Sequence, residues 1–417
     1  MLLGPPPSRS STHSSGLYHC STCGGPGKAF TVQVRDEEGS MGPPARQGVI
    51  GFDASRLQVG QRTGTEQYTW ELLGALGSID RGRHRYLLYA NGYPAALPPL
   101  PPHFELRSIP FPRLWTHLRL GAEMAMHAPD LLFVPAHVLP VWSPRRTVVT
   151  IHDLGYVHFP AAHPPSRRLY LRLSTRWNAW RATRIVAVTE ATKRDIIAHC
   201  RVPPGKIDVV HHGVSPRFRP VEDETTLRAS AACYGIQKPY LLYVGTIQPR
   251  KNLLRLIDAW AAYLSSSPAT TAILVIAGKS GWLTEQIERR AAGLGIADRV
   301  HYTGYVADGD LPALLSGAIA YLLPSLYEGF GLPVLEAQAC GTPVLTSTTS
   351  SLPEVAGDAA VLVDPMDTAA IRDGIARLIE DSELREGLRA RGLARVADRS
   401  WEHAARRTLA VLEAALR

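Results

Sequence analysis

Glu328 and Glu336 are separated by seven residues that include two glycines and a proline, so the two carboxylates could contact different parts of one ligand. The apolar run AIAYLLPS before them has the length of a buried strand. Pro333 suits the first turn of a helix that we expect over 333–340, and Gly341 suits its end. The following PVLTS predicts a second strand, which completes a strand–loop–helix–strand unit of a parallel sheet. Open sheets of this kind bind ligands at the carboxyl ends of their strands, where the Glu328 loop is expected.

The backbone at the start of this helix is suited to an anion. The N–H groups of Phe330, Gly331 and Leu332 lie where a helix leaves its donors unpaired and carries positive partial charge. A phosphate is the natural guest there. One glutamate could then accept hydrogen bonds from sugar hydroxyls and the other from a ribose diol. The alternative is that Glu328 is a loop charge and Glu336 a solvated helix residue, but the intervening glycines and proline favour a nucleotide-sugar site.

Arg250 and Lys251 form a second candidate group. They follow the strand-like run PYLLYVG, which ends at Gly245, and precede the helical segment NLLRLIDAW. Two adjacent cations at the carboxyl end of a strand can neutralise a diphosphate leaving group, because arginine offers a bidentate fork and lysine a point charge. The alternative is an ordinary surface charge pair.

His152 and Asp153 form a third candidate group, since they close the strand-like run that contains TIHDL. A pair in that place faces the cleft if the strand ends point at the ligand. The alternative is a capping aspartate beside a packed histidine, and the placement favours a functional pair.

Strand-like and helical runs alternate along the rest of the chain, which predicts an α/β protein with doubly wound parallel sheets. The first strand is GVIGFDA, and a glycine-bearing loop ending at Gly64 separates it from a helix. We expect a disordered tail over 1–46, because this segment is rich in Pro, Ser and Gly and has no hydrophobic period.

Four stretches in the right order carry a resemblance to a known family. They are SLYEGFGLPVLEAQACGTPVLTS, VGTIQPRKNLLRLIDAW, HYTGYVADGDL and SSLPEVAGDAAVLVDP. Together they resemble the retaining glycosyltransferases of family 4, and the resemblance extends over nearly all of 48–417. It implies the GT-B fold, in which two Rossmann-like domains face each other across a cleft. The domains expected on this basis are an acceptor domain over 47–215, a donor domain over 216–399, and a C-terminal helix over 400–417 that returns to the first domain.

The resemblance also implies roles for individual residues. Gly64 would lend a backbone N–H to the donor diphosphate, His152 would touch the donor sugar, and Asp153 would orient either His152 or the acceptor. Nucleobase recognition would lie beside Tyr305 and Val306, through the Val306 backbone. The remaining expected roles are diphosphate binding near Gly245 by Arg250, Lys251 and the amides of 330–332, sugar orientation by Glu328, and ribose binding by Glu336.

The implied reaction is transfer of a hexose from a nucleotide diphosphate sugar to an acceptor hydroxyl with retention of configuration. The family is thought to use same-face internal return, so no protein nucleophile and no metal ion are expected. The segments GTEQYTWELL and VGTIQPRKNL look most like bacterial mannosyltransferases of surface-polysaccharide assembly, which favours GDP-mannose as donor and a glycan or polyprenyl-linked acceptor. The competing hypotheses are a nucleotide-sugar epimerase on the same fold and a non-catalytic basic binding protein.

The composition limits the cellular compartments and the binding partners that can be expected for this protein. The 417 residues are 45% hydrophobic, enough for two α/β domains, and no apolar run is long enough to cross a bilayer. Five cysteines and the lack of a secretory signal at the N-terminus favour a cytoplasmic protein. The net charge of +8 permits anionic partners, although we expect no nucleic acid among them.

One basic segment leaves two interpretations open. No acidic residue occurs over 154–189, where arginines alternate with leucines and tryptophans, namely Arg167, Arg168, Arg172, Arg176, Arg181, Arg184, Leu169, Leu173, Trp177 and Trp180. A basic, aromatic, amphipathic helix suits the inner membrane surface or a polyprenyl-diphosphate acceptor. The alternative is an apolar stripe that faces the core and an arginine face in water.

Two short motifs resemble metal sites. Cys20 and Cys23 form a lone CxxC with no second pair, which argues against a zinc site. Asp308 and Asp310 form a DxD sequence, the metal motif of a different glycosyltransferase fold, but here they precede LPALL and are expected to cap that helix.

Overall fold

The computed structural model describes residues 48–58, 64–94, 96–136, 138–160, 164–278 and 284–417. The expected tail over 1–46, with Cys20 and Cys23, lies outside the described residues.

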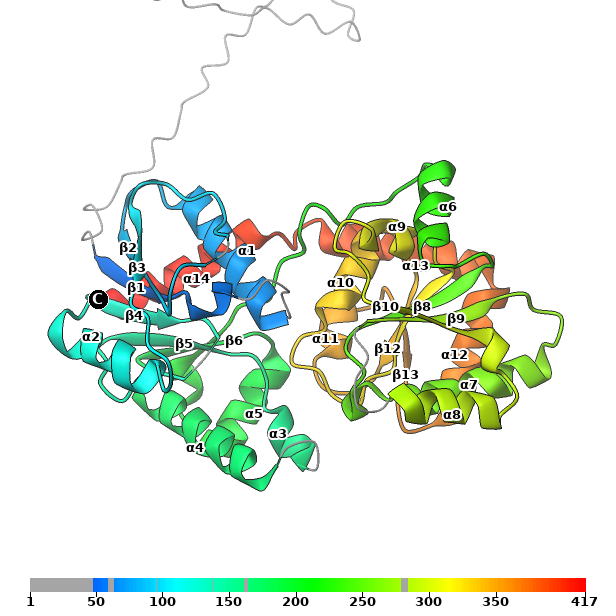
Figure 1. Ribbon diagram of the computed structural model, residues 1–417, viewed down its shortest axis with the longest axis horizontal. Coiled ribbons are helices and arrows are strands. Elements are labelled where there is room, and N and C mark those ends of the chain that lie inside the picture. The colour runs from blue at the N-terminus through cyan, green and yellow to red at the C-terminus, as the bar shows by residue number, and fades with distance from the viewer. Residues whose placement is uncertain (1–47, 59–63, 95, 137, 161–163, 279–283) are drawn as a thin grey trace, which may run out of the picture. The chain divides into compact units, whose positions relative to one another are not determined.

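A parallel sheet organises the first part of the described chain (Figure 1). Its strand order is β3-β2-β1-β4-β5-β6-β7. Every pairing is parallel, with Gly51 of β1 opposite Leu87 of β2, for example. The residues of β1, β2, β4, β5 and β6 are nearly all buried, as expected for a sheet with both faces covered, whereas most residues of the edge strands β3 and β7 are partly exposed. The strands are β1 (Val49–Asp53), β2 (Arg85–Ala90), β3 (Phe104–Ser108), β4 (Leu131–Val134), β5 (Thr147–Ile151), β6 (Arg184–Ala187) and β7 (Ile207–Val209).

Helices cover both faces of this sheet. On one face, Phe52 and Leu88 pack with the helices α1 (Gly64–Ile79) and α14 (Trp401–Leu416). On the other face, Leu132 packs with residues of α2, α4 and α5. Successive side chains of a strand point to opposite faces of the sheet, so each strand packs against the helices on both sides. The helices on the second face are α2 (Gly121–Met126), α4 (Pro165–Arg181) and α5 (Glu190–Cys200), and the short α3 (Gly155–His158) follows β5.

A second parallel sheet organises the remaining described residues, in the order β10-β9-β8-β11-β12-β13. Its strands are β8 (Tyr240–Val244), β9 (Ile273–Ala277), β10 (Val300–Gly304), β11 (Ala320–Leu323), β12 (Val344–Ser347) and β13 (Val361–Val363). The helices around it are α6 (Glu224–Cys233), α7 (Leu253–Ser266), α8 (Thr284–Gly293), α9 (Leu311–Ser316), α10 (Leu332–Ala339), α11 (Leu352–Ala356), α12 (Thr368–Glu380) and α13 (Ser382–Val396). The two sheets confirm the expected doubly wound α/β architecture.

The strand orders locate the places where ligands can enter. In the first sheet the order reverses at β1 and β4, and in the second at β8 and β11. Loops that leave a parallel sheet at such a switch point diverge and open a crevice. Gly64 follows β1, Arg250 and Lys251 follow β8, and Glu328 follows β11, so three of the candidate groups emerge at these openings.

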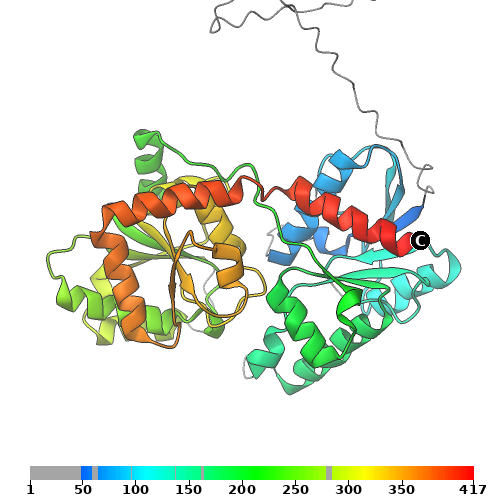
Figure 2. The same cartoon turned by 180° about the vertical axis from the view of Figure 1, so that it is seen from behind.

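The chain crosses between the two sheets at two neighbouring places (Figure 2). Val214 pairs with Ser400, and its amide donates to the carbonyl of Arg399 at 2.8 Å. A Cβ added at Gly213 would lie 2.2 Å from the Trp401 nitrogen, so only glycine allows this approach. Beyond the crossing, α14 packs on α1 and the first sheet. The domain boundaries expected at 215/216 and 399/400 lie beside this pairing.

None of the described helices is both long enough and apolar enough to cross a bilayer.

Candidate functional site

A cavity of about 550 Å³ opens where loops from both sheets meet. It receives the loops after β1 and β5 of the first sheet and after β8, β10 and β11 of the second. All of the site residues expected from the sequence line it, namely Gly64, His152, Asp153, Gly245, Arg250, Lys251, Tyr305, Val306, Glu328, Phe330, Gly331, Leu332 and Glu336. Residues predicted from separate motifs therefore share one chamber.

Glu328 lies at the centre of a buried charge cluster. The Lys251 ammonium donates to its Oε1 at 2.6 Å, and Arg250 Nη1 donates to its Oε2 at 2.5 Å. The Ser325 hydroxyl adds a third hydrogen bond, to Oε1, at 2.7 Å. The side chains of Glu328 and Lys251 are only 7% and 9% exposed. Sequence reasoning identified these charges but did not foresee that Glu328 pairs with both cations.

The pKa values in this cluster result from two opposing effects, burial and the nearby opposite charges. Burial alone would raise the pKa of Glu328, but Lys251 and Arg250 outweigh burial and bring this pKa to about 2. Burial lowers the pKa of Lys251, and the adjacent Glu328 carboxylate opposes that shift. Glu328 is therefore a carboxylate at neutral pH, and its charge helps both cations remain protonated in a buried place.

Glu336 has the opposite electrostatic environment. It lies half-buried on α10, on the cavity wall. Loss of water raises its pKa to about 7, with Arg217 opposing the shift and Asp308 reinforcing it. Near neutral pH this carboxyl group therefore exchanges between its protonated and ionised forms.

The loop between the two glutamates depends on its glycines. Gly331 is the N-cap of α10 and adopts a φ of 94°, which lies in the left-handed region. A Cβ added at Gly329 would lie 2.3 Å from the carbonyl oxygen of His152, so glycine is required where the loop meets the end of β5. Helix α10 begins at Leu332, one residue before the expected start. The amides of 330–332 consequently surround the N-terminal end of this helix, on the cavity wall.

His152 is held by a partner that sequence reasoning missed. Its Nε2 lies 2.8 Å from the carbonyl oxygen of Pro135 and must donate to it, because a carbonyl only accepts. Burial lowers the pKa of His152, which favours the neutral ring and leaves Nδ1 as an acceptor. Asp153 instead accepts from the Gly155 amide at 2.8 Å. The structure thus assigns the orientation of His152 to Pro135, not to Asp153.

The glycines after β1 and β8 differ in what requires them. A Cβ at Gly64 would meet no atom of the described residues within 4 Å, and the lack of a side chain there leaves space in the cavity. Gly245 adopts a φ of 152°, and a Cβ on the neighbouring Gly278 would lie 2.1 Å from the Gly245 carbonyl oxygen. Gly278 also lines the cavity. It was not predicted, although it is the last residue of the strand-like run TAILVIAG.

The segment after β10 brings two of the predicted residues to the cavity and corrects one expectation. Tyr305 is exposed and Val306 buried, and both line the cavity. Asp310 occupies the N-cap position of α9, but its side chain makes no capping hydrogen bond. It accepts from the Tyr234 hydroxyl at 2.7 Å instead, while Asp308 accepts from Arg217 at 3.3 Å. The expectation that this pair caps α9 is therefore wrong, because tertiary partners occupy both carboxylates.

His212 is a cavity residue that sequence reasoning missed. The run KIDVVHHGV on its own favours one continuous strand, whereas β7 ends at Val209 and His212 lies in the crossing segment. Its ring is 4% exposed and stacks on Phe330 at a centroid distance of 4.3 Å. Neither ring nitrogen hydrogen-bonds within the described residues. Burial lowers the pKa of His212, so the ring is neutral.

Helix α4 divides the apolar stripe that its sequence left open, because the half-buried Trp177 packs on the core and the other three residues do not. Leu169, Leu173 and Trp180 are 57%, 57% and 71% exposed. They share one face of the helix, whereas Ser174 and Asn178 on the opposite face are buried. Asn178 accepts from the amide of Leu139, which explains why a polar residue faces inward. The alternative of a core-facing apolar stripe is therefore wrong for these three residues.

Comparisons with known proteins agree with this geometry. One family model, Glycosyltransferase Family 4, matches residues 62–218, and another, Glycosyl transferases group 1, matches 234–395. O-antigen chain mannosyltransferase B of Escherichia coli is 35% identical over 268 residues, which cover 64% of this chain and 69% of that protein. The chain belongs to glycosyltransferase family 4. It is a glycosyltransferase, and the resemblance drawn from its motifs is confirmed.

Two further relatives show the reach of the similarity. The serotype-specific mannosyltransferase WbdA of Escherichia coli is 27% identical over 267 residues, which are 63% of this chain but only 32% of WbdA. The structure of Anabaena Alr3699/HepE in complex with UDP and glucose has a TM-score of 0.68 at 17% identity, and the alignment covers 88% of this chain and 100% of that one. The similarity of folds confirms the expected GT-B architecture for this family 4 chain.

Proposed function

We propose that this family 4 glycosyltransferase moves mannose from GDP-mannose to a hydroxyl of a glycan or polyprenyl-linked acceptor in surface-polysaccharide assembly, with retention of configuration. The observation that carries the proposal is the cavity that joins the buried Lys251, the half-buried Arg250, a helix N-terminus and two carboxylates. The names of the two Escherichia coli mannosyltransferases support the sugar and the pathway class. The UDP and glucose in the HepE structure support a nucleotide-sugar donor.

The phosphates would bind at the charged end of the cavity. Arg250 and Lys251 offer two positive charges, and the amides of 330–332 add the positive end of α10. Gly64 and Gly245 let the diphosphate approach the backbone without a side chain between them. Because these donors are already positioned, they can stabilise the negative charge that develops on the leaving diphosphate.

The sugar and the nucleoside would bind on either side of the phosphates. Glu328, which is paired with two cations, and the unprotonated Nδ1 of His152 can accept hydrogen bonds from sugar hydroxyls. Glu336 on α10 would bind the ribose diol, and the Val306 backbone would bind the base beside Tyr305. Asp153 is exposed on the cavity wall, where it can contact the acceptor.

The chemistry would follow same-face internal return. The bond between the anomeric carbon and the phosphate oxygen breaks, and the acceptor oxygen bonds to the same face of that carbon. The acceptor proton passes to an oxygen of the leaving diphosphate. The side chains then act by position and charge, and no divalent ion is needed, because Arg250 and Lys251 supply the positive charge.

Incubating the full-length protein with nucleotide sugars, with and without glycan acceptors, tests the proposal. We expect release of GDP from GDP-mannose to require an acceptor and to yield the retained anomer. An acceptor-independent change of the sugar would instead support the epimerase alternative. No turnover with any donor would leave the basic binding protein as the better hypothesis.

We also propose that α4 rests on the anionic cytoplasmic face of a membrane, where a polyprenyl-linked acceptor would be found. The exposed leucines and tryptophan can enter the interface, and the neighbouring arginines can meet lipid headgroups. Trp142 is also exposed, and the next residue, Ser143, accepts a hydrogen bond through its carbonyl oxygen from Arg181 of α4.

Vesicles of anionic and neutral lipid test this surface. Replacing Arg167, Arg168, Arg172 and Arg176 with glutamine should abolish salt-sensitive binding to anionic vesicles without changing the melting temperature, since all four side chains are exposed. A matched control replaces Arg228, Arg289, Arg406 and Arg407 of the other helices, whose side chains are also exposed. Unchanged vesicle binding in the α4 variant would refute the membrane surface.

A further inference from the structure

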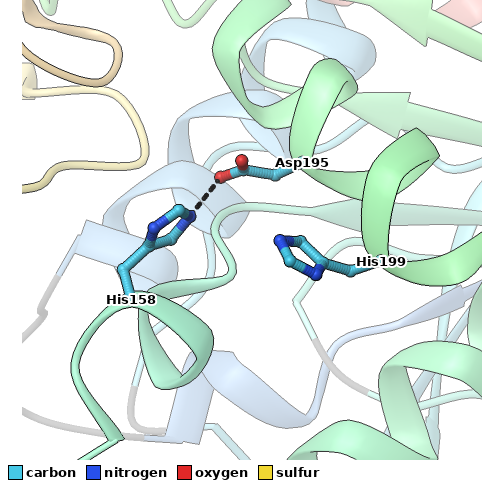
Figure 3. Close-up of side chains that lie close together, drawn as sticks. All are labelled: His158, Asp195 and His199. Carbon is cyan, nitrogen blue, oxygen red and sulfur yellow. Dashed lines mark hydrogen bonds and ion pairs between the residues drawn. The ribbon is translucent and has the colours of Figure 1, made fainter.

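Two histidines and an aspartate form a cluster outside the donor cavity (Figure 3). His158 is the last residue of α3, whereas Asp195 and His199 lie four residues apart on α5. That spacing places the last two on one face of the helix. One ligating atom from each residue lies within 4.8 Å of the other two, and Figure 3 shows the three side chains turned toward one another.

We propose that this cluster binds one zinc ion through one atom from each of the three side chains, with water as the fourth ligand. Two imidazoles and a carboxylate suit zinc, whereas magnesium and manganese favour sites made of oxygen alone. Zinc bonds of about 2.0–2.2 Å require ligand atoms within about 4 Å of one another, so only small side-chain rotations are needed. His158 and Asp195 are 36% and 21% exposed, so the ion can enter from solvent.

Hydrogen bonds around the cluster already orient its ligands. Asp195 Oδ2 accepts from His158 Nε2 at 3.0 Å and from the Tyr327 hydroxyl at 2.8 Å. Zinc would replace the first of these bonds, and Tyr327 would remain as the outer partner of the carboxylate. Such partners fix the orientation of metal ligands and increase affinity. The Tyr327 ring also stacks on His158 at a centroid distance of 4.5 Å.

The position of Tyr327 gives the site a structural consequence. Tyr327 directly precedes Glu328, and its hydroxyl accepts from the amide of Leu154 at 3.2 Å. A zinc ion bound to Asp195 and His158 would therefore fix the position of the carboxylate that Tyr327 contacts. This contact lies next to the loop that carries Glu328. The ion takes no part in the proposed transfer chemistry, since none of its three ligands lines the donor cavity.

Metal titration of the full-length chain tests the proposal. Cys20 and Cys23 are first replaced by serine, because they could bind zinc independently. Calorimetry on the metal-stripped protein should then show one equivalent of zinc, and cobalt in its place should give the intense visible spectrum of a four-coordinate ion. H199A should weaken zinc binding by at least about tenfold, and Y327F by about tenfold through the lost outer hydrogen bond.

The Glu123–His127 pair of α2 provides the matched control. It has the same four-residue spacing on a helix, with 3.6 Å between its ligating atoms, but no third ligand is grouped with it among the described residues. H127A should leave zinc affinity unchanged. Substoichiometric zinc binding by the metal-stripped protein would overturn the proposal. Equal affinity of H199A and its parent, with equal metal-free melting temperatures, would overturn it as well.

Discussion

The loop that carries Glu328 and the helix that carries Glu336 line one cavity, yet the pKa values of the two carboxyl groups are shifted in opposite directions. Glu328 is paired with two cations, and its pKa is about 2. Glu336 makes no salt bridge with any described residue, and its pKa is about 7. Burial is common to both, so the difference comes from the partners. One end of the cavity is permanently charged, and the other end acquires charge according to pH and ligand.

The largest effect should follow the loss of charge at Glu328. In Glu328→Gln, Arg250 and Lys251 lose the carboxylate that aligns them, and the sugar loses an acceptor next to the breaking bond. Turnover should fall by roughly 10²–10³, as for other electrostatic stabilisers. Steady-state kinetics with saturating donor and acceptor measure this. Wild-type turnover in the variant would show that the charged end does not act on the transition state.

The two carboxylates should also differ in how they couple folding to pH. The folded pKa of Glu328 lies below 4.5, so its contribution of about 3 kcal/mol is complete above that pH and is lost as pH falls toward 2. The folded pKa of Glu336 lies above 4.5, so its ionisation destabilises the fold as pH rises through 7. The cost is less than about 3 kcal/mol, because water reaches part of this side chain.

Denaturation at about pH 5 and about pH 8 compares the two variants with the wild type. Glu336→Gln should be more stabilising at the higher pH, because it removes a titration that lies between the two values. Glu328→Gln should be destabilising by a similar amount at both, because its titration lies below them. A Glu328→Gln effect that changes strongly between these pH values would contradict the charge assignment.

The effect of Glu336 on catalysis should be smaller and should concern binding. A ribose contact is made nearly equally in the ground and transition states, so its loss raises KM and spares kcat. We expect Glu336→Gln to raise the donor KM about tenfold, which corresponds to one or two lost hydrogen bonds. Donor affinity of the wild type should also increase as pH rises through 7, since the ionised carboxylate accepts both hydroxyls. A loss of turnover in this variant with unchanged KM would reverse the roles of the two glutamates.

Sequence reasoning predicted the fold and the membership of the site because both depend on short contiguous patterns. A few consecutive residues are enough to recognise a strand run, a Gly-bearing loop or the adjacent pair Arg250 and Lys251. The partners across the cavity could not be predicted in this way. Glu328 reaches Lys251 over 77 positions, and His152 reaches Pro135 over 17. Such pairs depend on strand order and on loop geometry, which local periodicity does not contain.

Removal of divalent metal should have the smallest effect on the rate. It tests whether the charged end of the cavity can stabilise the diphosphate without a metal ion. Arg250 and Lys251 supply positive charge without an ion, and the DxD carboxylates are held by Tyr234 and Arg217. EDTA should therefore change the rate by less than about twofold. The H199A chain is the control, because it lacks the proposed zinc site and isolates the donor cavity. If only manganese restored activity in both chains, Asp308 and Asp310 would instead be metal ligands. Arg250 and Lys251 would then need a metal ion beside them to complete the phosphate site.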